Sequence, residues 1–360
     1  MMQALTLARS PTRAAAASLV TPVPSTAPII PSWLVSSKLG RAVDAPVPPR
    51  DAPESRVSVI VVNYCGEDVL GPFLDSVLDG PLPPREVIVV DNASTDGSLE
   101  LLRARPGVHV VASPENLGFG GGCNLGAAHA TGNLLLFANP DVRLRHDTIA
   151  CLARDLLATP GAAIATANLG EPDMPPPVRT RQIEEVAAMS GALMLVERAH
   201  FERLGGFDPA IFLYSEDTDI CYRTVLAGRR VVKVWDAVGT HEAHGAGGGR
   251  RWSAEQIKNG LYVHLTARSA PAIVRYTGRM AVKTVVRGIR LRDPTVVSAW
   301  VETVRRLPAT LARRRRVRGA AASAERARLE RLAREHDHWV RVNWRRSVAA
   351  GLRRRVGRAG

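Results

Sequence analysis

The sequence predicts an α/β protein in which a mostly parallel central sheet is flanked by helices on both faces. Short β-branched runs alternate with helical stretches between residues 56 and 158, a pattern typical of parallel sheets. Polar residues follow the predicted strands at their carboxyl ends, where ligands of such sheets collect. The chain has 360 residues, 46% of them hydrophobic, which is enough for a substantial core.

The predicted elements follow one another from residue 56. The predicted strands are "RVSVIVVNY" (56–64), "REVIVVD" (85–91), "GVHVVAS" (107–113) and "LLLFA" (134–138). The predicted helices cover 67–79, 98–105, the segment opened by the glycine-rich 116–132, and about 147–158. Pro140 should end the fourth strand, because proline cannot donate a hydrogen bond to a strand ladder. After Arg251 the pattern is helical.

Composition divides the chain into three regions. Residues 1–55 are rich in Ala, Pro, Ser and Thr and are predicted to be mostly disordered, 56–250 form the α/β domain, and 251–360 form an Arg-rich helical tail. Residues 250–360 hold 28 Lys and Arg against 7 Asp and Glu, whereas residues 1–249 hold 20 against 27. The basic tail indicates an anionic partner.

The four cysteines give no metal or disulfide signal. Cys65, Cys123, Cys151 and Cys221 lie far apart without a C-x-x-C, so we expect reduced thiols in a cytoplasmic protein. No run of 18 apolar residues indicates a spanning helix, and the short apolar block after Arg13 is a poor signal peptide.

The glycine-rich "GFGGGCNLG" (118–126) is not a dinucleotide fingerprint, because Cys123 stands where a third glycine is needed. It also lacks the lysine of a P-loop. Two interpretations stay open: a turn that opens a helix, or a close approach of backbone amides to a phosphate or sugar.

Carboxylates follow two of the predicted strands. Asp91 either caps a turn or accepts the ring N–H of a nucleobase. Asp141 either caps the next helix or binds Mg²⁺ or Mn²⁺, which takes oxygen ligands and shares them with substrate phosphates. A third group, in "YSEDTDICYR" (214–223), is either a solvated helix start or the source of a general base. "GTHEAHG" (239–245) adds two histidines that could supply a metal ligand.

These motifs, in this order, resemble the family 2 glycosyltransferases with the GT-A fold, and most of all their bacterial rhamnosyltransferase-like branch. The resemblance covers about residues 56–250. It depends on "VSVIVVNY", "EVIVVDNASTDGS", "ENLGFGGGCNLG", "LLLFANPDV", "MSGALMLVERAHFERLGGFDPAIFLYSEDTDICYR" and "AVGTHEAHG". The family often has Asp-x-Asp where this chain has Asn139 and Asp141, and its histidine motif leaves His241 and His244 as alternatives here.

The resemblance implies a role for each matching residue. Asp217 would be the catalytic base, supported by Glu216 and Asp219. Asp141 and His241 would hold the metal, and "GGFDPAIF", with Gly206, Phe207 and Asp208, would lie on the acceptor side. The donor-binding residues would be Asn63, Tyr64, Asp91, Asn92, Asn116, Gly118 and Asn139.

The implied reaction is the transfer of a sugar from a nucleotide-diphosphate donor, with inversion at the anomeric carbon. In this branch the sugar would be rhamnose and the donor dTDP-rhamnose. The acceptor would be a saccharide or a polyprenyl-diphosphate-linked saccharide in cell-envelope synthesis. The cofactor would be Mg²⁺ or Mn²⁺. The basic tail would bind the anionic inner face of the cell membrane, although a merely solvated extension stays open, and nucleic acid is disfavoured because aromatic residues make up only 5%. The alternative function is a non-catalytic scaffold that binds sugar nucleotides or membranes. The oligomeric state is not predicted.

Overall fold

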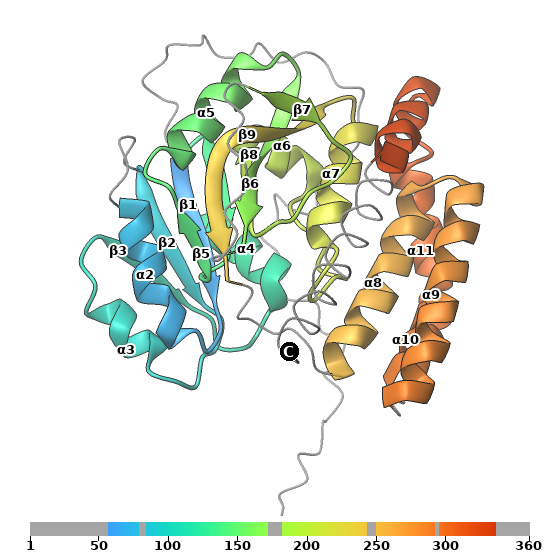
Figure 1. The fold of residues 1–360 in the computed structure, drawn as a ribbon, viewed down its shortest axis with the longest axis horizontal. Helices are drawn as coiled ribbons and strands as arrows, with labels where there is room; N and C mark the ends of the chain where they lie inside the picture. The colour runs from blue at the N-terminus through green and yellow to red at the C-terminus, as the bar shows by residue number, and fades with distance from the viewer. Residues whose placement is uncertain (1–56, 79–83, 172–181, 243–249, 292–294, 336–360) are drawn as a thin grey trace, which may run out of the picture. The chain divides into compact units, whose positions relative to one another are not determined.

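The computed structural model describes residues 57–78, 84–171, 182–242, 250–291 and 295–335, so the predicted disordered segment 1–55 lies outside the described residues. Within these ranges nine strands form one sheet in the order β3-β2-β1-β4-β8-β6-β9-β5, with β7 paired to β9 (Figure 1). The strands are β1 (Val57–Asn63), β2 (Glu86–Asp91), β3 (Val108–Ala112), β4 (Leu134–Ala138), β5 (Val142–Leu144), β6 (Ala162–Gly170), β7 (Ile183–Glu185), β8 (Leu193–Glu197) and β9 (Arg230–His241).

One half of the sheet is parallel and the other half is mixed. Strands β3, β2, β1 and β4 are all parallel, and they are the four predicted strands within two residues at each end. In the other half, β8 runs antiparallel to β4 and β6, β6 and β9 are parallel, and β5 and β7 run antiparallel to β9. The predicted fold class is confirmed, and the antiparallel strands are an addition to it.

Helices cover both faces of the sheet. They are α2 (Glu67–Leu78), α3 (Ser98–Arg103), α4 (Gly118–His129), α5 (Thr148–Ala158), α6 (Arg198–Leu204) and α7 (Glu216–Leu226). Strand β1 shows the two faces, because Val59 and Val61 pack in one hydrophobic cluster with α2 and α5, whereas Ile60 packs in another with α4 and α7. This alternation follows from the two-residue period of a strand.

The glycine-rich segment lies mostly inside α4 rather than in a turn before it. A Cβ added at Gly122 would come within 2.7 Å of Val62, and one added at Gly126 within 2.4 Å of Ile60. These glycines therefore allow α4 to pack closely on β1. Of the two interpretations of this segment, the turn that opens a helix fits only Gly118, the first residue of α4, whose φ is +74°.

The C-terminal helices pack against this core. They are α8 (Arg250–Ala267), α9 (Ala270–Leu291), α10 (Thr295–Arg305), α11 (Leu307–Val317) and a further helical stretch at 323–335. Leu329 and Leu332 are buried in the same cluster as Ile60. The guanidinium of Arg268, 1% exposed, lies 3.3 Å from the carboxylate of Glu330. Part of the predicted tail thus completes the core.

Candidate active site

The buried oxygens at the ends of β1 and β2 form the first part of the candidate site. The sheet register places Asn63 beside Asp91, and these side chains are 0% and 2% exposed. The Nδ2 of Asn63 donates to the Ser94 hydroxyl at 3.2 Å, and the Ser94 amide donates to Asp91 Oδ2 at 3.3 Å. The Oδ1 atoms of both residues have no hydrogen-bond partner among the described residues. Such a buried acceptor costs about 1–3 kcal/mol, so the pair is suited to a ligand that donates N–H or O–H.

The neighbouring asparagines are already hydrogen-bonded to protein. Asn92 donates to Asn116 Oδ1 at 3.0 Å and to the Gly118 carbonyl at 3.1 Å, and it accepts from the Leu117 amide at 2.9 Å. Asn92 and Asn116 therefore hold the start of α4 against the end of β2. Tyr64, by contrast, is 54% exposed at the end of β1.

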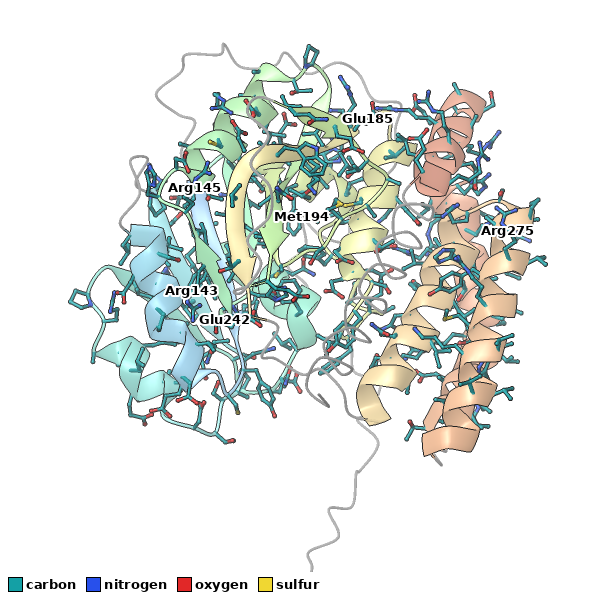
Figure 2. All side chains as sticks on the ribbon, in the orientation of Figure 1. Arg143, Arg145, Glu185, Met194, Glu242 and Arg275 are labelled. Atoms are coloured by element: carbon teal, nitrogen blue, oxygen red, sulfur yellow. The ribbon has the colours of Figure 1, made fainter. Side chains whose placement is uncertain are left out.

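Asp141 and His241 come together although they are distant in the sequence. The ladder between β5 and β9 pairs Val142 with His241, and Asp141 Oδ1 lies 3.2 Å from His241 Nε2. Asn139 Nδ2 lies 3.5 Å from the same nitrogen. Beside them, Arg143 pairs with Glu242 at 3.5 Å (Figure 2). The Glu242 amide donates to the Asp141 carbonyl at 3.0 Å, which fixes the two segments together.

Two alternatives for this cluster can be compared with the structure. Asp141 does not cap the following helix, because β5 intervenes and α5 begins only at Thr148, after Asp147 as its N-cap. His244 lies outside the described residues. No group of three or more His, Cys, Asp or Glu side chains that could hold a metal occurs in the described part of the chain.

Asp217 lies at the start of α7, beside the segment that precedes β8. Tyr214 and Ser215 have positive φ values of 65° and 76°, which form the tight turn into the helix. Asp217 Oδ2 accepts from the Gly191 amide at 2.9 Å, and Oδ1 accepts from the Thr218 hydroxyl at 3.1 Å. A Cβ at position 191 would come within 2.8 Å of Asp217 Cβ, so glycine is needed for this approach.

Glu216, the first residue of α7, is buried beside α4, where a Cβ added at Gly120 would lie 3.6 Å from Glu216 Cβ. Glu216 is 7% exposed, and its Oε2 has no hydrogen-bond partner among the described residues. Burial, together with the negative charge of Asp217, raises the pKa of Glu216 to about 8. Glu216 is therefore largely protonated at neutral pH.

Replacing Glu216 by glutamine is expected to reduce the pH dependence of stability. The pKa of this carboxyl rises from 4.5 to about 8 on folding, so the wild type loses stability as pH increases through that interval. Glutamine stays neutral, and between pH 5 and 8.5 the variant should gain at least about 1.4 kcal/mol on the wild type, the equivalent of one pKa unit. Urea unfolding at both pH values measures this, with Glu100→Gln as the exposed control. Parallel pH profiles for wild type and variant would exclude a protonated Glu216.

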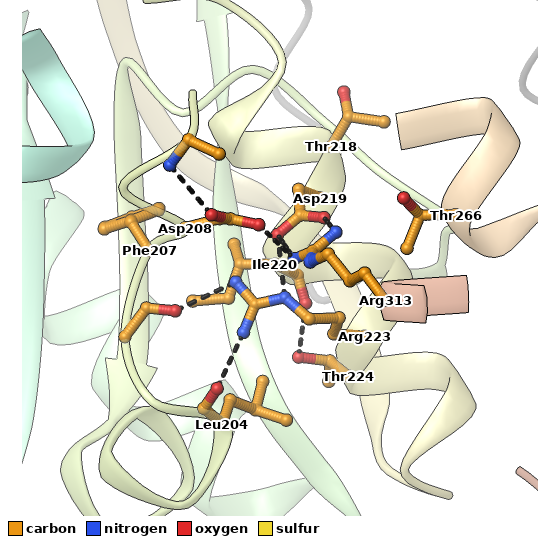
Figure 3. Close-up of polar contacts among 12 residues, drawn as sticks. Leu204, Phe207, Asp208, Thr218, Asp219, Ile220, Arg223, Thr224, Thr266 and Arg313 are labelled. Carbon is orange, nitrogen blue, oxygen red and sulfur yellow. Dashed lines mark hydrogen bonds and ion pairs between the residues drawn. The ribbon is translucent and has the colours of Figure 1, made fainter. Parts of the chain in front are cut away.

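Asp219 is part of an ion-pair network with two arginines (Figure 3). Its carboxylate is 2.7 Å from Arg223 Nε and 2.8 Å from Arg313 Nη1. Burial alone would raise the pKa of Asp219, but the charges of Arg223 and Arg313 outweigh it and lower this pKa. Because both oxygens are held by guanidinium groups, Asp219 is suited to positioning α7 rather than to proton transfer.

The acceptor-side loop joins the same network. Arg223 donates to the Gly206 carbonyl at 2.9 Å, and Asp208 is 2.7 Å from Arg313 and accepts from the Tyr262 hydroxyl at 2.8 Å. Phe207 is 1% exposed and packs against other phenylalanines. The Phe207 ring therefore anchors this loop to the core, and the acceptor-side role of the loop stays a prediction.

Ser94, Gly191 and Arg313 were not among the predicted site residues. Ser94 lies in "DNASTDGS", next to Asp91, so a wider interpretation of that motif would have included it. Gly191 could be recognised only through its distance from Asp217. Arg313 is the first of four consecutive arginines, and nothing in the sequence distinguishes it from the others.

Solved structures that share this fold include complexes with UDP and with UDP-GlcNAc. The structure of Staphylococcus aureus TarS residues 1–349 superposes with a TM-score of 0.52 at 17% identity, covering 77% of this chain and 89% of that chain. GalNAc-T7 with UDP, GalNAc and Mn²⁺ gives 0.50 at 19% identity, covering 60% and 48%. The fold is therefore GT-A-like.

Residues 58–234 match the model of glycosyl transferase family 2, and through this region the chain belongs to that family. It is 28% identical over 236 residues to the N-acetylglucosaminyl-diphospho-decaprenol L-rhamnosyltransferase of Mycobacterium tuberculosis, which covers 52% of this chain and 77% of the relative. It is 26% identical over 223 residues to rhamnosyltransferase WbbL of Escherichia coli K12, covering 52% and 84%. The chain is thus a nucleotide-sugar glycosyltransferase, and the predicted family is confirmed.

Proposed function

We propose that this glycosyltransferase inverts the anomeric carbon of its donor, that the donor is dTDP-rhamnose, and that the acceptor is a hydroxyl of a saccharide linked to a polyprenyl diphosphate. Two relatives are named rhamnosyltransferases, and the mycobacterial one is named for a decaprenyl-diphosphate-linked sugar. The product would enter cell-envelope polysaccharide, and the enzyme would work on the inner face of the membrane. The assignment to glycosyl transferase family 2 does not depend on this proposal.

The observation that carries the donor assignment is the pair of buried oxygens at the ends of β1 and β2. Asn63 Oδ1 and Asp91 Oδ1 have no partner among the described residues, and a pyrimidine base presents a ring N–H that one of them could accept. Asp91 is the stronger acceptor, because hydrogen bonds to charged groups are worth about 1.5–3 kcal/mol. Asn139 and Tyr64 would line the same donor side.

The reaction would be a single displacement. Asp217 takes the proton of the acceptor hydroxyl, and the acceptor oxygen forms a bond to the anomeric carbon. The bond from that carbon to the diphosphate oxygen breaks on the opposite face, and the leaving group departs as a nucleoside diphosphate. Amide and hydroxyl donors from Gly191 and Thr218 fix the orientation of the Asp217 carboxylate before the acceptor arrives.

Asp141 and His241 would hold a divalent cation. Their nearest atoms are 3.2 Å apart, and these two side chains would suffice for Mg²⁺ or Mn²⁺ if oxygens of the donor and water supplied its other ligands. When bound, the cation supplies positive charge that stabilises the departing diphosphate. GalNAc-T7, which shares the fold, was solved with Mn²⁺.

Replacing Asp91 by alanine is expected to weaken donor binding about 10- to 100-fold, because one hydrogen bond to a charged group is lost. Isothermal titration with dTDP-rhamnose and with UDP-sugars, each with Mg²⁺ or Mn²⁺, measures the loss and ranks the donors. Asp75→Ala, at a 59% exposed side chain on α2, is the control. An unchanged dissociation constant in Asp91→Ala would contradict the donor site. Failure of the wild type to bind dTDP-rhamnose more tightly than UDP-sugars would contradict the rhamnose assignment.

A further inference from the structure

The outer side of α9 presents an apolar row that the rest of the described chain leaves open. Val274, Val282 and Val285 are 71%, 66% and 58% exposed, and their spacing places them on one side of the helix. Gly278 lies between them, and a Cβ added there would meet no atom within 4 Å. The opposite side of α9 is covered, because Tyr276 and Met280 pack on the cluster formed by α8 and α10.

A basic row runs beside the valines. Arg275, Arg279 and Lys283 recur every four residues, and all three are exposed. Figure 2 shows Arg275 at the outer edge of the helical region. The sequence of α9 itself contains no aspartate or glutamate. The helix is thus apolar on one strip, basic on the next and buried on the third.

The arginine-rich run of α11 is mostly engaged within the protein. Arg313 binds Asp219, and Arg314 donates to the carbonyls of Leu265 and Arg268 at 2.7 and 2.8 Å. Arg318 donates to the Ala267 carbonyl at 2.6 Å. These three arginines therefore fix α11 to α7 and α8, and Arg315 and Arg316 are the exposed members of the run. On α9 the exposed basic row lies beside exposed valines, so that helix combines the charge and the apolar surface that an anionic lipid surface would contact.

We propose that the α9 face, defined by Val274, Val282, Val285, Arg275, Arg279 and Lys283, docks the enzyme on an anionic lipid surface. Valines would enter the interfacial region while the basic row contacts lipid phosphates, as in helices that lie in the plane of a membrane. Within the described ranges no helix combines the length and hydrophobicity needed to cross a bilayer. The inference rests on the proposed function, because a polyprenyl-linked acceptor is reached only at the membrane.

The test uses the full chain and vesicles of phosphatidylcholine that contain about 30% phosphatidylglycerol, an anionic lipid. Arg275→Gln with Lys283→Gln should lower the vesicle partition coefficient about thirtyfold at low salt, since each charge adds about 1 kcal/mol. Arg315→Gln with Arg316→Gln, which removes the same charge from exposed positions on α11, is the matched control and should change it much less. Equal losses in the two double variants would overturn the α9 assignment.

The apolar row needs its own variant. Val274→Ser, Val282→Ser and Val285→Ser together should lower partitioning at least about tenfold, and the loss should persist at high salt because screening acts only on the charges. Binding equal to the wild type would overturn the role of the valines. Two other occupants of the α9 face, a second copy of the chain and nucleic acid, are tested in parallel. Sedimentation would reveal a wild-type dimer that becomes a monomer in the valine variant, and a binding assay would reveal whether duplex DNA binds as tightly as the vesicles do. Either result would overturn lipid docking.

Donor hydrolysis in the absence of vesicles separates this inference from the proposed function. All α9 variants should hydrolyse the donor at the wild-type rate, because none of the changed residues belongs to the candidate site. If neither the wild type nor any variant turns over a donor while the vesicle partitioning changes as expected, the proposed function is rejected and the docking surface is retained. If turnover is normal and the vesicle results fail, the docking surface alone is rejected.

Discussion

Asp217→Asn is expected to lower turnover by at least about a hundredfold while the donor dissociation constant stays nearly unchanged. A positioned general base contributes about 10²–10⁴ to the rate, and asparagine cannot take a proton. The substitution keeps the size of the side chain, so the Gly191 amide can still donate to an oxygen at this position. Single-turnover kinetics with saturating acceptor, together with calorimetry for the donor, separates the two effects.

Near-normal turnover in Asp217→Asn would mean that a neighbouring carboxylate is the general base. The structure distinguishes the two neighbours, Asp219 and Glu216. Asp219 is held by Arg223 and Arg313, so it is a poor candidate. Glu216 is largely protonated at neutral pH because its pKa is raised to about 8 by burial and by Asp217. In Asp217→Asn the charge that helps to raise the pKa of Glu216 is gone, so this pKa should lie below its wild-type value of about 8. Near-normal turnover that increases with pH in the range below 8 would make Glu216 the base. Near-normal turnover with a flat profile would exclude Asp217 and Glu216 as the base.

The parallel half of the sheet could be predicted because its signals are local. Strands β1, β2 and β4 are short β-branched or apolar runs that end in polar residues, and parallel pairing brings those ends to one edge. This reasoning placed Asn63 and Asp91 together before any register was known. The structure adds what no local pattern contains, namely that Asn63 Oδ1 and Asp91 Oδ1 have no hydrogen-bond partner in the part of the chain that the structure describes.

The mixed half of the sheet and the cation cluster depend on pairing between distant segments. His241 reaches Asp141 because β9 pairs with β5, a strand of three residues that carries little periodic signal. The sequence of the α4 glycines leaves open a helix-opening turn or a close approach of backbone amides to a ligand, because their packing on Val62 and Ile60 is evident only from the tertiary contact. In the same way, the charge of the C-terminal region was evident from composition, but which arginines are engaged internally was not.

Arg313→Met is expected to destabilise the protein by about 3–5 kcal/mol, the cost of removing one partner from a buried ion pair. Asp219, 2% exposed, would keep only Arg223, and Asp208 would lose its arginine. Since α11 supplies Arg313 and α7 carries Asp217, the loss should also loosen the start of α7 and lower turnover. Arg316→Met, an exposed change on the same helix, should cost less than about 0.5 kcal/mol.

The pH dependence distinguishes this ion pair from simple packing by the Arg313 side chain. The pKa of Asp219 is lowered below 3.8 in the folded protein, so its contribution to stability is present above that pH and is lost as pH falls through the lowered value. Arg313→Met removes one cause of the lowering. The difference in unfolding free energy between wild type and variant should therefore be largest near neutral pH and should shrink below about pH 4. A difference that stays constant from pH 7 to pH 3 would show that the arginine acts through packing alone, and the ionic connection between α11 and α7 would be rejected.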